Sequence, residues 1–236
     1  MDGLDLAIRF SYIVNRLHFC GPHDAMDGFL RYATKHDNAD EVRKSLMRFE
    51  GFFPYLSAIA SKHGKDPFDH DVVEAYWIGN PLLDAFTKDD MRMIMSDLGR
   101  RGLPKSWVED LSARMPDGAM PHHAFHVMYV GVGRTTGTVE TTLQNMDNCR
   151  PSWGRAESVM RDSVVVDTQT LTIEKGIYSL RSDVKTAVYL PQLLTDVKID
   201  DVVALHWGFA GMRLSKIQSQ NLQKYSAAVI SIVNGR

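Results

Sequence analysis

Imidazole and thiol side chains are the groups in this chain with the clearest potential for chemistry. His18, Cys20 and His23 lie within six residues of one another, and His122 and His126 are four residues apart. A spacing of four places two side chains on one face of either a helix or a strand. Because imidazole nitrogen and thiolate sulfur bind transition metals, these five residues predict a metal or haem site in the N-terminal part of the chain.

Simpler interpretations of the same residues stay open. Their spacing matches no established zinc pattern. His122 and His123 can mark the boundary between a loop and a strand, and in a strand His123 would face away from its neighbours. Cys20 can be an inert thiol, since a buried free cysteine often acts only as a small hydrophobic residue.

Other motifs argue against several classes of enzyme. The glycine-rich run from Gly131 to Gly137 lacks the Lys-Ser/Thr pair of a P-loop, and its spacing differs from the dinucleotide-binding fingerprint. The acidic cluster at residues 69–74 is explained by helix capping and by the helix dipole. We therefore expect neither a nucleotide nor a carboxylate-based active site at these positions.

The amino-acid composition limits the class of protein and its location in the cell. Hydrophobic residues make up 44% of the 236 residues and charged residues 24%, with a net charge of −2; these values are typical of globular proteins. No apolar run is long enough for a membrane helix, and no signal peptide is evident. Two cysteines exclude a disulfide framework. These features predict a cytoplasmic protein that binds neither membrane nor nucleic acid.

Charge divides the chain into two parts. Residues 1–147 carry 16 Lys/Arg against 21 Asp/Glu, whereas residues 148–236 carry 11 against 8. Eight of the nine histidines precede Cys149, and only His206 follows it. We therefore predict two domains: a histidine-rich helical domain over 1–147 that ends in a strand and a helix, and a second domain over 148–236.

The first part carries mostly helical signals. Apolar residues recur at helical spacing, and Asn, Asp, Gly and Pro lie where helices begin and end. The predicted helices cover about 3–17, 23–35, 38–49, a segment after Pro54, a segment from Asp69 or Asp71 through Trp77, the region of 91–98, and a segment after Pro104. A strand is predicted over Phe125–Val130 and a helix over about 138–147.

The sequence of the second part predicts a small β-barrel followed by a helix that closes it. Strands are predicted at 155–160, 163–168, 171–174, 177–181, 185–190 and 201–207, separated by turn residues. Short strands in so small a segment favour a closed barrel, which leaves no edges. Ser215 and Gln218 form a capping-box pattern, which predicts a helix over 215–233. The fold class is α+β.

Two segments of this second part resemble the HypC/HupF family of hydrogenase assembly chaperones. Residues Ile199–Ala210 include His206-Trp-Gly-Phe-Ala, and the family ends its barrel with a similar segment before a C-terminal helix. Residues Cys149–Gly154 resemble the start of that family, although the family's cysteine directly follows the initiator methionine. The resemblance covers about 149–233 and implies an OB-like barrel. The whole chain is also similar to an uncharacterised family of nickel–iron hydrogenase gene clusters.

The resemblance implies a metal site and partners. Cys149 and His206 would meet at the barrel mouth and hold iron that carries cyanide and carbonyl ligands, with Arg150 lowering the pKa of the thiol. The partners would be the hydrogenase large-subunit precursor or a HypD-like iron–sulfur assembly scaffold. We therefore predict a non-catalytic hydrogenase maturation factor that carries or transfers an iron fragment.

Two alternatives stay open. One is a metal- or haem-dependent enzyme that uses the N-terminal His/Cys pocket to make or deliver a diatomic ligand. The other is a protein–protein interaction module that binds no metal.

Overall fold

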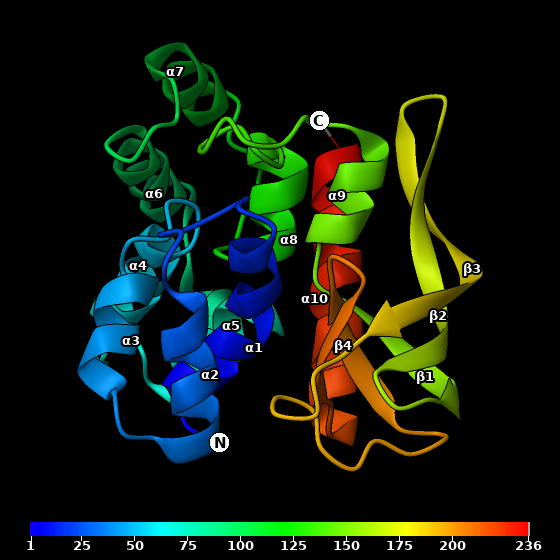
Figure 1. The fold of residues 1–236 in the computed structure, drawn as a ribbon. Coiled ribbons are helices and arrows are strands. Elements are labelled where there is room, and N and C mark those ends of the chain that lie inside the picture. The colour runs from blue at the N-terminus through cyan, green and yellow to red at the C-terminus, as the bar shows by residue number, and fades with distance from the viewer. Residues whose placement is uncertain (236) are drawn as a thin grey trace.

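The computed structural model of the chain describes residues 1–235, and Figure 1 shows a helical body beside a β-barrel. The helical part comprises α1 (Gly3–Arg16), α2 (Met26–Lys35), α3 (Ala39–Leu46), α4 (Phe53–His63), α5 (His70–Trp77), the 3-10 helix η1 (Pro81–Ala85), α6 (Lys88–Gly99), α7 (Lys105–Ala113), α8 (His123–Phe125), the π-helix η2 (His126–Gly131) and α9 (Leu143–Cys149). The predicted helical N-terminal region is therefore confirmed, with ends that differ by a few residues.

The strand predicted over Phe125–Val130 is wrong, because this segment forms α8 and η2. His122 caps the turn: its Nδ1 accepts the backbone N–H of Ala124 at 3.1 Å. Residues 121–132 are all buried. The β-branched and aromatic residues that favour a strand also suit a fully buried helix, so tertiary packing overrides their intrinsic preference. The following helix, predicted over 138–147, is α9 and begins after its cap Thr142.

The barrel is closed, with strand order β1-β2-β3-β5-β4. Its strands are β1 (Ser152–Val159), β2 (Ser163–Glu174), β3 (Ile177–Val188), β4 (Val202–His206) and β5 (Phe209–Arg213). All pairs are antiparallel except β3 with β5, which pair in parallel only at Val188 and Phe209. The predicted strands 163–168 and 171–174 are one strand, as are 177–181 and most of 185–190. Strand β5 was not predicted.

Helix α10 (Lys216–Asn234) lies between the helical body and the barrel (Figure 1). Ser215 and Gln218 form the predicted capping box at its start. The helix contacts α8 and η2 on one side and β1 and β3 on the other. Asn234, at its end, exchanges two hydrogen bonds with the backbone of Tyr178 in β3. The C-terminal helix therefore joins the two halves of the molecule.

The main hydrophobic core also spans both halves. It extends from residues of α1 to Phe209 and Met212 of β5 and Leu222 and Val229 of α10. A smaller cluster that includes Val164, Val166 and Val203 fills the barrel itself. The predicted domain boundary between residues 147 and 148 falls inside α9 and stays a prediction. Within residues 1–235, no helix has both the length and the apolar character that crossing a membrane requires.

Candidate metal centre

Three side chains far apart in sequence converge where the helical body meets the barrel. His123 lies in α8, Cys149 ends α9 and His206 ends β4, and one ligand atom of each lies within 4.8 Å of the other two. The Cys149 Sγ is 3.6 Å from His123 Nε2. Nitrogen and sulfur bound to one tetrahedral metal at ordinary bond lengths would be about 3.6 Å apart. The spacing therefore already suits a shared metal ion.

The position and tautomer of His123 are fixed by a buried tyrosine. The Tyr76 hydroxyl donates to the carbonyl of Gly51 at 2.7 Å. The same hydroxyl lies 2.7 Å from His123 Nδ1. Because its single proton is already committed to Gly51, it accepts from the Nδ1–H of His123. This assignment leaves the Nε2 lone pair of His123 directed toward Cys149.

His206 is oriented in the same way by a backbone carbonyl. Its Nδ1 donates to the Phe10 carbonyl oxygen in α1 at 2.8 Å. Its Nε2 is buried and makes no hydrogen bond of ordinary geometry among the described residues, although the backbone of Cys149, like that of Phe10, opposes the fall in the pKa of the ring. Histidines that bind metals usually donate their second ring N–H to a carbonyl or a similar acceptor. Both histidines of the group therefore have the outer hydrogen bond of a ligand. The inner nitrogen of His123 accepts from the Cys149 thiol, whereas that of His206 makes no hydrogen bond of ordinary geometry.

Burial keeps all three side chains neutral when no cation is bound. Desolvation raises the pKa of the Cys149 thiol to about 12, and the nearby Trp207 side chain opposes this rise. Desolvation also lowers the pKa of His206 to about 4, and that of His123 well below its ordinary value. A bound metal ion reverses this balance for the thiol, because it stabilises the thiolate directly. The three side chains could therefore hold a metal ion.

Arg150 does not act on the thiol as predicted. Its guanidinium is turned to Asp147, with Nε and Nη2 donating to Oδ1 at 3.0 and 2.8 Å. Nη2 also donates to the carbonyl of Gln169 in β2. Arg150 is 2% exposed, and its charge is compensated by Asp147. The prediction that Arg150 lowers the pKa of Cys149 is therefore wrong.

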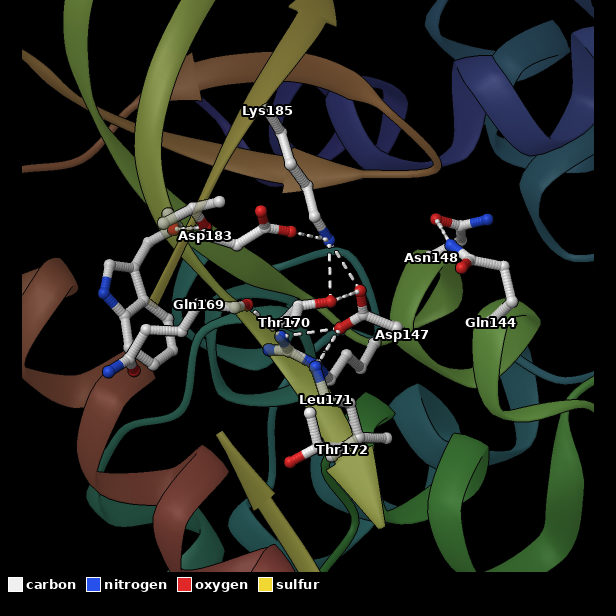
Figure 2. Close-up of polar contacts among 12 residues, drawn as sticks. Gln144, Asp147, Asn148, Gln169, Thr170, Leu171, Thr172, Asp183 and Lys185 are labelled. Atoms are coloured by element: carbon white, nitrogen blue, oxygen red, sulfur yellow. Dashed lines mark hydrogen bonds and ion pairs between the residues drawn. The ribbon is translucent and has the colours of Figure 1, made fainter. Parts of the chain in front are cut away.

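Asp147 instead fixes the end of α9 on the barrel. Its carboxylate accepts the backbone N–H of Leu171 at 2.8 Å and the Thr170 hydroxyl at 2.7 Å, both from β2. Lys185 of β3 donates to it at 2.6 Å, and Figure 2 shows Lys185 and Thr170 directed at the carboxylate. Burial by itself would raise the pKa of Asp147, but Arg150 and these donors lower it below its ordinary value. The network therefore holds Cys149, two residues further along, in place.

The β4–β5 hairpin places His206 and closes the site with a strained tryptophan. Trp207 and Gly208 form the two-residue turn, with φ of 52° and 67°, the signs of a type I′ turn. A bulky residue at positive φ is unusual and often marks a functional position. The backbone N–H of Trp207 donates to the backbone carbonyl of Asn148 at 2.7 Å. The hairpin tip is therefore attached to the residue before Cys149.

A cavity of about 40 Å³ adjoins the group and is mostly apolar. One water requires roughly 10–15 Å³, so the space accepts a few groups of that size. Its walls include Ser11, Trp77 and Thr135. The Ser11 Oγ, Trp77 Nε1 and Thr135 Oγ1 atoms are buried and have no hydrogen-bond partner within residues 1–235. The cavity walls therefore carry polar groups that a small polar ligand would satisfy.

The comparisons with known proteins place the chain in a family. The family model described as a family of unknown function, DUF6390, matches residues 1–236. The chain belongs to the DUF6390 family. No curated protein and no solved structure matches it. Family membership thus assigns no activity, and the resemblance to HypC/HupF proteins rests on the two C-terminal segments alone.

The secondary candidates of this DUF6390 chain fall in three places. His126 lines the cavity; its Nδ1 lies 3.1 Å from the Tyr55 hydroxyl, and its ring is roughly parallel to that of His123. His122 is turned away from the group and its ring stacks on Tyr225 of α10. His122 therefore does not share the face of His126, because the segment is not one regular helix or strand.

The loop at residues 18–23 divides its three candidates. Cys20 lines the cavity, and burial, together with the neighbouring Cys149, raises the pKa of its thiol. His18 and His23 are exposed and contact each other, with 2.9 Å between their Nδ1 atoms. The residues of the predicted N-terminal pocket thus lie apart: Cys20 and His126 line the cavity, whereas His18 and His23 form a pair at the surface. His123, which the sequence placed on the wrong face, is the residue that completes the buried group.

Proposed function

We propose that this DUF6390 chain holds an iron ion bearing small ligands at His123, Cys149 and His206 and passes it to a nickel–iron hydrogenase during assembly. The observation that carries the metal-binding part is the state of His206 Nε2. It is buried, makes no hydrogen bond of ordinary geometry among the described residues, and belongs to a ring whose other nitrogen is already bonded to Phe10. A buried polar atom without a partner costs about 1–3 kcal/mol, and a metal ion would remove that cost.

A metal accounts for the group better than nucleophilic catalysis does. The Cys149–His123–Tyr76 chain has the connectivity of a thiol nucleophile with an oriented base. Activated cysteines, however, have a lowered pKa and some solvent exposure, whereas Cys149 is 9% exposed and burial raises its thiol pKa to about 12. A catalytic dyad also leaves His206 Nε2 unexplained.

Iron with small ligands is favoured by the donor set and by the space beside it. One soft thiolate and two borderline imidazoles suit iron with strong-field ligands. Three protein ligands leave coordination positions open toward the cavity, where Ser11 and Trp77 offer unpartnered polar atoms. A haem is not favoured, because a cavity of about 40 Å³ is far below the roughly 300–1,000 Å³ of typical organic ligand pockets.

The hydrogenase context rests on the resemblance of residues 149–154 and 199–210 to the HypC/HupF chaperones. In this proposal the partner is the large-subunit precursor or a HypD-like scaffold, the protein acts in the cytoplasm, and transfer requires an exchangeable interface. The helical part supplies His123 and thereby a third ligand beyond the Cys/His pair that the resemblance implies.

Anaerobic purification followed by metal analysis and infrared spectroscopy tests the proposal. We expect about one iron per chain and absorption bands in the region of metal-bound cyanide and carbonyl stretches. Cys149→Ser and His206→Gln should lose the iron. Cys20→Ser removes a thiol that lies on the cavity wall outside the group, and this variant should retain the iron at equilibrium. Iron without diatomic bands would refute the cargo, and wild-type protein that binds no metal would leave the interaction module as the remaining function.

A further inference from the structure

The surface loop at residues 18–23 brings two metal-binding side chains together in a fixed geometry. His18 and His23 are exposed, their rings stack with centroids 4.7 Å apart, and their Nδ1 atoms lie 2.9 Å apart in a hydrogen bond that a bound metal ion would replace. Two imidazole nitrogens at adjacent positions of one six-coordinate metal would be about 2.9 Å apart at a bond length of roughly 2.0–2.1 Å. The pair therefore has the spacing of a two-histidine metal site.

This spacing is imposed by the loop. The buried side chain of Asn15 donates its amide hydrogens to the carbonyls of Cys20 and Pro22, at 3.2 and 2.7 Å. Gly21 has φ of 78° and packs so closely on Phe49 that a Cβ atom would lie 2.4 Å from its ring. His18 itself has φ of 58°. Two anchored carbonyls and two left-handed residues thus fold the loop so that its histidines meet.

The same loop reaches the interior through the residue between the two histidines. Cys20 lines the cavity that also contains His123, Cys149 and His206, and its thiol is close enough to Cys149 for their charges to interact. Phe19, its neighbour, packs against Trp207 at the closing hairpin, with ring centroids 4.6 Å apart and the rings tilted. Surface nitrogen ligands and an interior sulfur ligand are therefore separated by only one or two residues.

We propose that loop 18–23 is an uptake site for a divalent transition metal, in which His18 and His23 bind the ion at the surface and Cys20 passes it to the buried group. In the metal-free loop the two Nδ1 atoms share one proton in their hydrogen bond. When they bind the ion, that proton moves to the Nε2 atom of its own ring, and the other ring already carries its proton on Nε2, so both rings stay neutral and no oxidation is involved. The ion then exchanges nitrogen ligands for the Cys20 sulfur, which loses its proton to solvent. The transfer step rests on the proposed function, whereas binding at the surface pair does not.

Nuclear magnetic resonance of the histidine rings tests the surface site by itself. In full-length protein titrated with Zn²⁺, the Nδ1 resonances of His18 and His23 should shift, and the shift of His18 should be lost in His23→Ala. His36 is the matched control, because it is also exposed and has a left-handed φ of 53° but lies outside the loop. Unchanged His18 and His23 resonances, or equal shifts at His36, would overturn the surface site.

Loading kinetics with Co²⁺ test the relay. Coordination of Co²⁺ by Cys149 gives a thiolate charge-transfer absorption, and the growth of the part that is lost in Cys149→Ser reports arrival at the buried group. At limiting Co²⁺, His18→Asn, His23→Ala and Cys20→Ser should slow this growth about tenfold or more, by analogy with the 10–100-fold effect of altering residues around metal sites. The final amplitude should match wild type. His18→Asn keeps a residue that tolerates positive φ, and His36→Asn should load at the wild-type rate.

The two hypotheses fail in different ways. Equal loading rates in wild type and the loop variants overturn the relay while the buried site stands. If wild type develops no thiolate absorption, the buried site is refuted, and the Zn²⁺ titration still decides whether His18 and His23 bind metal.

Discussion

The hydroxyl of Tyr76 is the sharpest place to test how the buried group is organised, because removing one oxygen atom should affect metal binding without touching a ligand. In Tyr76→Phe, the His123 Nδ1–H loses its acceptor at 2.7 Å, and the Gly51 carbonyl loses its donor at 2.7 Å. Tyr76 is fully buried, so water does not replace either bond. His123 then lacks the contact that fixes its ring and its tautomer.

Two effects of different size follow. Each of the two buried polar groups left without a partner costs about 1–3 kcal/mol, so the free energy of unfolding should fall by about 2–6 kcal/mol. Loss of the outer hydrogen bond of a metal-binding histidine costs about 10–100-fold in metal affinity. Urea unfolding of the metal-free protein measures the first effect, and competition with a chelator of known affinity measures the second.

Tyr55→Phe is the matched control. Tyr55 is equally buried and its hydroxyl contacts His126 Nδ1 at 3.1 Å, but His126 is not in the His123/Cys149/His206 group. We expect a loss of about 1–2 kcal/mol in stability and a metal affinity within about twofold of wild type. If Tyr76→Phe binds metal as tightly as wild type, or if both variants lose affinity equally, the assignment of His123 as an oriented ligand is refuted.

Three further predictions concern pH, the Asp147 network and the metal. The pKa values of His122, His126 and His206 are about 4 in the folded protein because of burial, against about 6.5 in the unfolded protein. Between these two pKa values the unfolded state binds more protons than the folded state. The free energy of unfolding therefore falls as the pH falls from about 6.5 to about 4. Each histidine should lower the free energy of unfolding by about 2 kcal/mol between pH 7 and pH 5. Urea unfolding across that range measures this loss, and constant stability would contradict it. Asp147→Asn leaves Arg150 buried without its counter-charge and should cost about 3–5 kcal/mol, whereas Lys185→Met, at a partly exposed donor, should cost about 1 kcal/mol or less; equal losses in chemical unfolding would show that the network is not centred on Asp147 and Arg150. Metal at about 100 times its dissociation constant should stabilise the wild type by about 2.7 kcal/mol and leave Cys149→Ser unchanged in thermal unfolding, and equal stabilisation of both would place the metal elsewhere.

Much of the fold could be predicted because local signals and tertiary structure agree. Apolar spacing and capping residues predicted the main helices, and Ser215 with Gln218 predicted the start of α10. The closed barrel followed from short strands and turn residues. The proximity of Cys149 and His206 was implied only by the family resemblance, since no spacing rule relates a helix end to a strand 57 residues later.

The elements that the sequence analysis predicted wrongly or not at all have physical explanations. A strand was predicted over Phe125–Val130, with His123 near its boundary, because Val127, Tyr129 and Val130 favour strands. Full burial allows this segment to form α8 and η2 instead. Its helix begins with a histidine cap, which is not among the usual capping residues. Strand β5 was missed because Trp207-Gly208 is an unusual pair for a two-residue hairpin turn, where Asn-Gly is preferred.

The support of His206 by Phe10 connects residues 196 positions apart. A chain emerging from the ribosome has α1 long before β4 exists, so neither a nascent chain nor a truncated product can complete the ligand set. In the proposed function, metal binding is thereby postponed until synthesis has passed His206 and its strand has docked on the first helix. Under that proposal, only a completely synthesised and folded chain would bind the ion.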